Sequence, residues 1–261
     1  MNQSQLHDLA NLLQNSLHTV VLTGAGISVE SRVPTFRGEN GLWEEFRPDE
    51  YATLTAFNRD PGKCWKMFLR MLDTIRNAAP NPAHRALAEL ERNHLIAAVI
   101  TQNIDGLHQA AGQRTTIELH GSIHTVTCQT CHEPVTTDSI TVDPLNLPPR
   151  CRCGGVFKPD VILFEEPLHS DRFIESFRHV QRCSVLMLIG TSGFVHPANR
   201  FPEIAHSHGA TIVDINPTAS LTTRSLPGAI EIRESAPAFL DRLLEHLKGR
   251  ASSNFQDPSS R

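Results

Sequence analysis

Short continuous runs of apolar residues recur along the chain, and each is bounded by glycine or polar residues. The runs cover residues 20–22, 96–100, 185–189, 211–215 and 230–232. Runs of this length between turn residues predict buried β-strands. Polar turns follow most of them, at the end of the strand where an α/β sheet presents its ligands. The pattern therefore predicts a doubly wound parallel sheet with helices between the strands.

Helical spacing of apolar residues fills most of the intervening segments. Leucines at positions 6, 9, 12 and 13 predict an amphipathic helix over residues 3–16, and apolar residues from Trp65 to Ile75 predict a helical insertion within residues 41–79. Further helices are expected to begin at Asn81-Pro82 and to cover residues 198–208 and 238–247. Two more strands, 117–121 and 161–166, are expected on either side of a cysteine-rich insertion. The polar tail 251–261 is predicted to be disordered.

Composition narrows the class of protein. The chain has 261 residues, 39% of them hydrophobic, which allows one large domain or one core with an elaborated insertion. A net charge of -4 gives no general attraction to nucleic acid or to an anionic membrane surface. No run approaches the roughly 18–20 apolar residues of a membrane span, and the N-terminus lacks the basic-then-apolar order of a signal peptide. We therefore expect a cytoplasmic protein that binds neither membranes nor nucleic acid directly.

Four of the six cysteines form a cluster with the spacing of a metal site. They are arranged as Cys-x-x-Cys, a gap of 19 residues and Cys-x-Cys, at Cys128, Cys131, Cys151 and Cys153. Four thiolates supply one tetrahedral zinc site, and a site with no open position is structural rather than catalytic. Disulfides are the alternative, but a reducing compartment favours the metal.

The first apolar run ends in Gly24-Ala25-Gly26, followed by Ser28. Glycine lets backbone N–H groups approach a phosphate that a Cβ atom would push away, so this turn is interpreted as a phosphate-binding loop. A dinucleotide fingerprint would have a third glycine where Val29 stands. The loop therefore differs from that of dehydrogenases, and an ordinary strand–turn remains the alternative. A rigid turn with an aromatic ring and a guanidinium, Pro34-Thr35-Phe36-Arg37, follows closely.

Two further polar clusters are candidates for chemistry. Gln102-Asn103-Ile104-Asp105 follows the strand at 96–101 and either binds a ligand or caps the next helix. His120 is the candidate general base because an imidazole with a pKa of about 6.5 accepts a proton at neutral pH. Gly121 follows it and is interpreted as leaving room for a substrate. Any single histidine among the 14 in the chain is more often a surface or core residue.

Together these motifs resemble those of the sirtuins, the NAD-dependent protein deacylases, in order and in spacing over about residues 5–248. The resemblance implies a discontinuous Rossmann-like NAD-binding domain (1–38, 80–122 and 158–250) and a small domain made of the helical insertion (39–79) and a zinc ribbon (123–157). It implies catalytic roles for His120, Asn103 and Asp105. The residues implied to bind NAD are Gly24, Ala25, Gly26, Ser28, Phe36, Arg37, Gln102, Asn103, Ile104, Asp105, Gly190, Thr191, Ser192, Asn216 and Ala236.

The same resemblance implies the reaction. The acyl oxygen of an acylated protein lysine displaces nicotinamide from NAD, His120 deprotonates a ribose hydroxyl, and the products are lysine and O-acyl-ADP-ribose. ADP-ribosyl transfer and NAD hydrolysis share the first bond cleavage and are the alternatives, although neither requires the histidine base. A nucleic-acid-binding zinc ribbon is a distant alternative, because the charges of residues 123–158 are balanced. We expect a monomer or weak oligomer.

Substrate residues implied by the resemblance are Phe68, Met71, Phe164, Glu165 and Val195. Sirtuins that remove succinyl groups carry a tyrosine and an arginine where Phe68 and Met71 stand, so the sequence predicts a preference for acetyl and other neutral acyl groups. Both residues could instead be core positions of a helix. The chain departs from the family at Arg32, Glu165 and Glu234, which stand where glycine is usual.

Overall fold

The larger part of the molecule is a six-stranded parallel sheet. The computed structural model describes residues 3–38, 41–221 and 226–253. The strands are β1 (Thr19–Thr23), β2 (Ala98–Thr101), β3 (Thr116–Glu118), β7 (Val185–Ile189), β8 (Thr211–Ile215) and β9 (Ile230–Ile232), in the order β3-β2-β1-β7-β8-β9. This is the strand order of the Rossmann fold, whose direction of growth reverses between the two central strands, here β1 and β7. The predicted doubly wound parallel sheet is confirmed.

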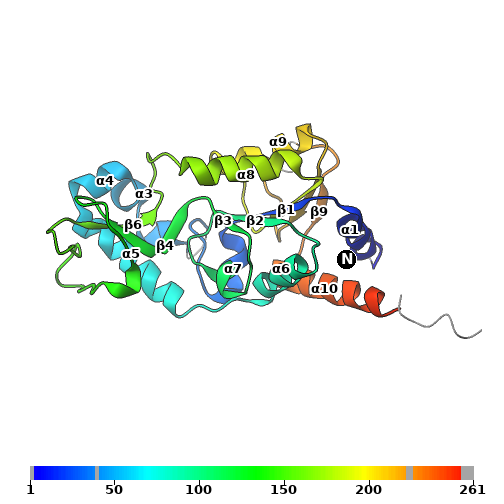
Figure 1. The fold of residues 1–261 in the computed structure, drawn as a ribbon, viewed down its shortest axis with the longest axis horizontal. Coiled ribbons are helices and arrows are strands. Elements are labelled where there is room, and N and C mark those ends of the chain that lie inside the picture. Colours follow the sequence, from blue (N-terminus) through cyan, green and yellow to red (C-terminus); the bar gives the residue numbers. More distant parts are fainter. Residues whose placement is uncertain (1–2, 39–40, 222–225, 254–261) are drawn as a thin grey trace, which may run out of the picture.

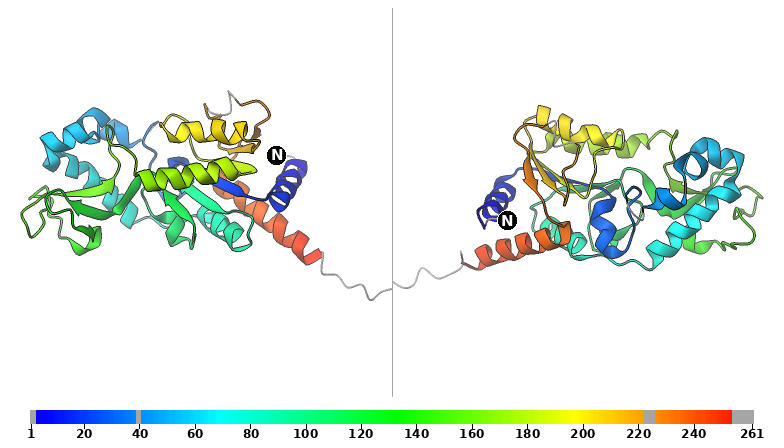
Figure 2. Two further views of the ribbon diagram at one scale, coloured as in Figure 1. Left: turned by 45° about the horizontal axis from the view of Figure 1, so that its top comes forward. Right: turned by 180° about the vertical axis from the view of Figure 1, so that it is seen from behind.

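Helices cover both faces of this sheet, as Figures 1 and 2 show. Side chains of a strand alternate between faces, so Val21 packs with α1 (Gln3–Asn15), α6 (Pro82–Arg92) and α10 (Ala236–Ser253). Val20 and Leu22 pack on the other face with α8 (Ser170–Arg182) and α9 (Phe201–Ser207). The central strands β1, β2 and β7 are buried along their whole length, which explains why they appear in the sequence as unbroken apolar runs.

A smaller region lies beside this sheet and has its own core. It combines helices α2 (Leu42–Glu45), α3 (Pro48–Tyr51), α4 (Leu54–Arg59) and α5 (Pro61–Arg76) with an antiparallel sheet of order β5-β4-β6, formed by β4 (Gly121–Cys128), β5 (Pro134–Thr136) and β6 (Phe157–Val161). One hydrophobic cluster joins the helices to the strands. Within it, the buried Trp65 of α5 donates from Nε1 to the carbonyl of Phe157 at 2.7 Å. The shared core supports the division into two domains, which stays a prediction.

Short elements complete the chain: 3₁₀ helices η1 (Ala25–Ser31), η2 (Thr137–Ser139) and η3 (Ala198–Arg200), and the one-turn helix α7 (Leu107–Ala110). None of the helices described over these three ranges is long and apolar enough to cross a membrane. The cytoplasmic location stays a prediction.

Several predicted boundaries were wrong. The strand expected at 161–166 is β6 at Phe157–Val161, because pairing with β4 rather than the apolar run selects the residues that form it. The strand expected at 117–121 is interrupted by a turn at Leu119-His120. Helix α8 was not predicted, although Phe173, Phe177 and Val180 recur at helical spacing along it.

The predicted C-terminal boundaries also change. Helix α10 runs from Ala236 to Ser253 rather than over 238–247, so residues 251–253 of the expected disordered tail are helical. The rest of that predicted tail lies outside the described residues. The helix expected at 198–208 begins with the 3₁₀ turn η3 and continues as α9.

Candidate active site

A cavity of about 1230 Å³ opens at the carboxyl edge of the parallel sheet. Its walls come from the loops that follow β1, β2, β7 and β8, from helix α5 and from the segment 161–168. In open α/β sheets, ligands bind at this edge where the strand order reverses, which here is between β1 and β7. The volume exceeds that of a typical small-ligand pocket and suits a ligand as large as a dinucleotide together with a second substrate.

The glycine loop after β1 packs directly against the loop after β7. Gly24 donates its N–H to the carbonyl of Ile189 at 3.1 Å, and Gly26 donates to Gly190 at 2.9 Å. A Cβ atom on Gly26 would lie 2.7 Å from backbone atoms of Gly190, and Gly190 has a φ of +60°. Gly26 and Gly190 are therefore required because the two loops approach each other closely. The N–H groups of Gly24 and Gly26 are thus engaged by the loop after β7, and both residues line the cavity. The interpretation of this turn as a phosphate-binding loop stays a prediction.

A buried hydrogen-bond network joins the loop after β1 to the loop after β2. Asn103 donates from Nδ2 to the carbonyl of Gly24 and to Ser28 Oγ, each at 3.2 Å. Ser28 Oγ donates to Asp105 Oδ2 at 2.7 Å. Burial raises the pKa of Asp105, while hydrogen bonds from Leu107 and Ser28 oppose that rise. Ser28 and Asp105 thus support the cavity from behind and are not among the residues that line it.

Asp105 also acts as a cap. Its Oδ1 accepts from the N–H of Leu107, the first residue of α7, at 3.0 Å. Gln102 and Ile104 line the cavity, and Gln102 donates from Nε2 to Thr191 Oγ1 at 3.0 Å. The two interpretations offered for this segment therefore divide among its residues, with Asp105 capping and Gln102 facing the cavity.

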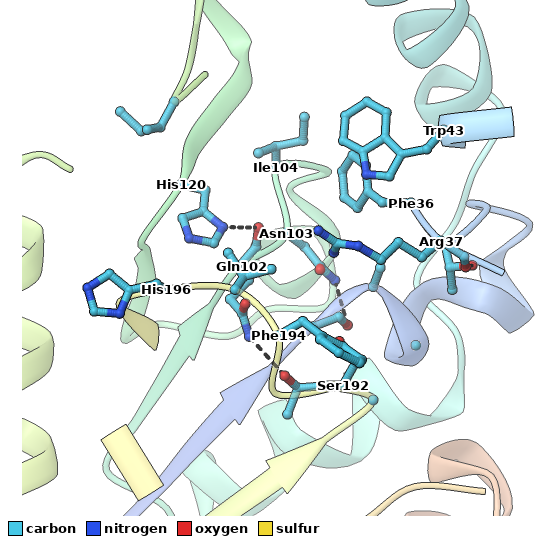
Figure 3. A pocket seen from close by; sticks show the side chains of 18 of the residues that line it. Phe36, Arg37, Trp43, Gln102, Asn103, Ile104, His120, Ser192, Phe194 and His196 are labelled. Carbon is cyan, nitrogen blue, oxygen red and sulfur yellow. Dashed lines mark hydrogen bonds between the residues drawn. The ribbon is translucent and has the colours of Figure 1, made fainter. Parts of the chain in front are cut away.

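His120 lies in the turn between β3 and β4 and faces the cavity (Figure 3). Its Nδ1 is 3.1 Å from the carbonyl oxygen of Gln102, which can only accept, so Nδ1 carries the proton and Nε2 keeps its lone pair. Burial lowers the pKa of His120, and the hydrogen bond to Gln102 partly offsets this effect. The imidazole is therefore neutral near pH 7 and can accept a proton at Nε2.

The role expected for Gly121 was wrong. This residue has a φ of +83°, and a Cβ atom on it would lie 1.8 Å from the carbonyl oxygen of Asp160. Glycine is needed because β6 passes close to the start of β4, and not because a substrate needs the space. The contact fixes the turn that carries His120.

Phe36, Trp43 and Arg37 form the wall opposite His120 (Figure 3). The rings of Phe36 and Trp43 lie 5.2 Å apart, and Trp43 lies 6.1 Å from Phe164. In the view of Figure 3, Arg37 extends from this side toward Asn103. Trp43 was not predicted as a site residue, since a tryptophan in a helical insertion reads equally well as core.

Phe68 and Met71 line the cavity from α5 and also belong to the core of the small region. Phe68 is fully buried, and its ring meets that of Trp65 edge-on at 5.7 Å. The core interpretation of this pair therefore holds, and the same two side chains line the cavity with apolar atoms. Their contact with an acyl group stays a prediction.

Of the three residues that stand where glycine is usual in the family, two have backbone angles in the left-handed region. Arg32 has a φ of +66° and Glu165 a φ of +75°, a region that costs a residue with a Cβ roughly 1–2 kcal/mol. Glu234, the third, forms an ion pair with Arg242 at 2.6 Å.

The remaining predicted ligand residues also line the cavity, namely Ala25, Thr191, Ser192, Val195, Asn216 and Ala236. Asn216 donates from Nδ2 to the buried Asp214, which Arg233 pairs at 2.8 Å. Phe194 and His196 line it too and were missed, because a loop after a strand gives no spacing signal.

The four clustered cysteines lie at one end of the small antiparallel sheet. Their sulfur atoms are all within 4.8 Å of one another, with Cys128 to Cys153 at 3.5 Å and Cys131 to Cys151 at 3.8 Å. A tetrahedron of thiolates around zinc, with Zn–S bonds of about 2.3 Å, has sulfur atoms about 3.8 Å apart. Backbone N–H groups of Cys131 and Thr130 lower the pKa of the Cys128 thiol. The donor set fits one structural zinc ion.

Fold and site define an α/β protein with a dinucleotide-sized cavity, a buried neutral histidine facing that cavity and a cluster of four cysteines that fits a metal ion. A protein-family model described as "Sir2 family" matches residues 24–197. An NAD-dependent protein deacylase 2 from Pyrobaculum aerophilum is 45% identical over 244 residues, covering 93% of this chain and 96% of that protein. An NAD-dependent protein deacylase from Aeropyrum pernix is 45% identical, covering 90% and 94%. The chain belongs to the Sir2 family.

Solved structures agree with this assignment. A Sir2 homologue variant in complex with ADP-ribose superposes with a TM-score of 0.89 at 38% identity, covering 97% of this chain and 98% of that one. A Sir2 homologue–NAD complex has a TM-score of 0.86 at 39% identity, covering 94% of both chains. A Sir2–p53 peptide–NAD⁺ complex has a TM-score of 0.82 at 32% identity, covering 94% and 98%.

Proposed function

We propose that this chain is an NAD-dependent protein-lysine deacylase that prefers acetyl and other neutral acyl groups. The observation that carries the proposal is the state of His120. Its Nδ1–H is engaged by Gln102, and its Nε2 is free to accept a proton in a cavity at the switch point of the sheet. The relatives named above, which the chain matches over nearly its whole length, support the same activity.

The proposed NAD site is the part of the cavity between the loops after β1, β7 and β8. Ala25, Ser192 and Asn216 line it and offer polar groups at the carboxyl edge of the sheet. Arg37 supplies a positive charge for the phosphates, and Phe36 an aromatic face. Asn103 and Asp105 are proposed to hold the loop after β2 in shape through Ser28. When bound, NAD supplies the ribose carbon at which the acyl oxygen reacts and nicotinamide as the leaving group.

His120 is the proposed general base of this reaction. Because burial keeps the imidazole neutral, Nε2 can remove a proton from a hydroxyl that enters the cavity, and the carbonyl of Gln102 stabilises the ring as it becomes charged. A positioned base contributes roughly 10²- to 10⁴-fold to the rate.

The acyl group is proposed to lie against the apolar end of the cavity. Phe68 and Met71 from α5 and Leu163 from the segment after β6 contribute surface there. None of the three can pair with a carboxylate, and an unpaired charge in such a place costs free energy. A succinyl-lysine should therefore be a poor substrate. The zinc ion is proposed to hold the small sheet together without taking part in the chemistry.

One experiment tests these proposals together. The protein is incubated with NAD and matched peptides that carry acetyl-, butyryl- or succinyl-lysine, and the products are identified by mass spectrometry, with reactions lacking NAD as controls. We expect free lysine and O-acyl-ADP-ribose, and a kcat/KM for the acetyl peptide about 10- to 100-fold above that for the succinyl peptide.

Other outcomes distinguish the alternatives. Peptide or protein carrying ADP-ribose would indicate ADP-ribosyl transfer, and ADP-ribose released without loss of the acyl group would indicate NAD hydrolysis. Equal or faster turnover of the succinyl peptide would contradict the placement of Phe68 and Met71 at the acyl group. A cytoplasmic location and a monomeric or weakly oligomeric state remain part of the prediction.

A further inference from the structure

One wall of the cavity connects His120 to the helical insertion. Ile162 donates its N–H to the carbonyl of His120 at 2.9 Å. Two residues further on, Phe164 donates to the carbonyl of Ala52 at 2.9 Å and accepts from the N–H of Leu54 at 3.0 Å. Residues 162–165 are therefore held at both ends and form a fixed wall beside the proposed base.

Glu165 lies on this wall with a backbone conformation that is unfavourable for a residue with a Cβ atom. Its φ of +75° lies in the left-handed region. Its Oε2 accepts from both the N–H and the hydroxyl of Thr55, at 3.0 Å and 2.6 Å. These two bonds fasten the carboxylate to the start of α4 and lower the pKa of Glu165. The residue is exposed, ionised at neutral pH and fixed in position.

The charge of Glu165 is not balanced within the described part of the chain. The neighbouring Glu166, by contrast, is paired with Lys158 at 2.9 Å. Among the described residues that line the cavity, Arg37 is the only lysine or arginine. The described ion pairs do not include Glu165. Of the three glutamates that line the cavity, Glu166 is paired, whereas Glu165 and the exposed Glu30 take part in none of the described ion pairs. Glu165 is the unpaired carboxylate on the wall that begins at His120.

We propose that Glu165 is a specificity-determining residue that favours substrate proteins with a lysine or arginine close to the acylated lysine. The inference rests on the proposed deacylase function. Glu165 is three residues from Ile162, so its Cα lies at most about 10 Å from that of the residue bonded to His120. An extended substrate segment advances about 3.3 Å per residue. A basic side chain one to three residues from the acyl-lysine can therefore reach the carboxylate.

The expected effect is modest because the carboxylate is exposed. Exposed ion pairs change binding by about two- to fivefold, and salt screens them. The contact lies away from the reacting atoms, so it should act equally on bound substrate and transition state and appear in KM rather than in kcat.

The test uses acetyl-lysine peptides that differ at one position within three residues of the acetyl-lysine, where they carry arginine, alanine or glutamate. At low ionic strength we expect the kcat/KM for the arginine peptide to exceed that for the glutamate peptide by about fivefold, mainly through KM. In Glu165→Gln, which keeps the size and can still accept from Thr55, the ratio should fall to about one. Glu245→Gln, on α10 outside the cavity lining, should keep the wild-type ratio.

An unchanged ratio in Glu165→Gln, or equal turnover of the arginine and glutamate peptides by the wild type, would overturn the inference. If Glu165→Gln does not fold, the wild type alone provides the test. In about 1 M salt, where the Debye length is about 3 Å, its preference for the arginine peptide over the glutamate peptide must shrink, and an unchanged preference would overturn the inference. Peptide affinities measured by fluorescence anisotropy test the preference without turnover. Binding preference without deacylation of any peptide would sink the deacylase proposal alone.

Discussion

The parallel-sheet region and the small region are stabilised in different ways. In the first, β1 and β7 are buried at every position between two layers of helices. In the second, the strands of a three-stranded sheet share one core with α5 and the other helices of the insertion, and the edge strand β5 is mostly exposed. Burial between two layers of helices suffices for the first region, whereas the second combines a smaller core with four cysteine ligands.

The proposed active site depends on both regions. His120 lies in the turn at which the chain leaves the parallel sheet at β3 and enters the small sheet at β4. Its partner Gln102 follows β2 of the large sheet, whereas Gly121 is fixed by its contact with β6 of the small one. Disturbing either region should therefore displace the base.

The largest effect should come from removing the metal ligands of the small region. Replacing Cys128 with serine should abolish zinc binding and prevent recovery of folded, soluble protein, because the free energy of zinc binding, about 10–16 kcal/mol in small zinc modules, is comparable to the whole stability of a domain. Zinc content per chain and the yield of soluble protein measure this effect.

The matched control is Cys183→Ser in the parallel-sheet region. Cys183 is buried and its Sγ–H donates to the carbonyl of Val180 at 3.1 Å, a bond that a serine hydroxyl can replace. This variant should fold and bind one zinc. A metal-free protein that is fully stable would show that the cysteine cluster has another role.

The second largest effect is expected for His120, which lies between the two regions. His120→Ala should lower kcat/KM for an acetyl-lysine peptide by about 10²- to 10⁴-fold while the fold and NAD affinity are kept, because only proton transfer is lost. Stopped assays and calorimetric titration with NAD separate the two quantities. Full activity in this variant would refute the assignment of the base.

The pH profile sharpens this prediction. Since burial lowers the pKa of His120, its Nε2 stays unprotonated as the pH falls through the ordinary histidine range. The acid limb of kcat/KM should therefore lie below pH 6.5. An acid limb above neutral pH would contradict it.

A smaller effect is expected for a histidine of the parallel-sheet region. His84 is fully buried, and burial lowers its pKa from 6.5 to about 4. The unfolded chain therefore binds a proton that the folded chain does not, and stability falls as pH drops from 6.5 toward 4. The contribution of His84 is about 3 kcal/mol over that interval.

Urea unfolding of the wild type and of His84→Gln at several pH values measures this contribution. The cysteine ligands also take up protons in acid and lower the stability of both proteins. The quantity to compare is therefore the difference between wild type and variant in the slope of unfolding free energy against pH. Equal slopes would show that His84 is not buried as a neutral imidazole.

The smallest effect is expected at Arg32, in the loop after β1. Because Arg32 has a φ of +66°, Arg32→Gly should relieve about 1–2 kcal/mol of strain, less about 0.5–1 kcal/mol for the entropy of glycine. The free energy of unfolding should rise by at most about 1.5 kcal/mol, and Arg32→Lys, which keeps the Cβ, should change it little. A lower stability of the glycine variant would show that Arg32 makes a contact that offsets its strain.

The sequence alone determined the parallel sheet, the order of the site segments and the metal ligands. Fully buried strands leave unbroken apolar runs, as at Val185–Ile189, and Cys128 and Cys131 stand at the spacing of a metal knuckle. Such features are local, so period and spacing report them directly.

Tertiary structure decided what these residues contact. Gly26 faces Gly190 and Gly121 faces Asp160 because of the order in which the strands assemble, so the need for glycine comes from a partner far away in the sequence. Likewise, the carbonyl of Gln102 selects the tautomer of His120. The segment 157–161 became a strand through pairing with β4, although its own sequence is polar and contains a proline. Contacts between distant segments have no period, and only the folded chain brings them together.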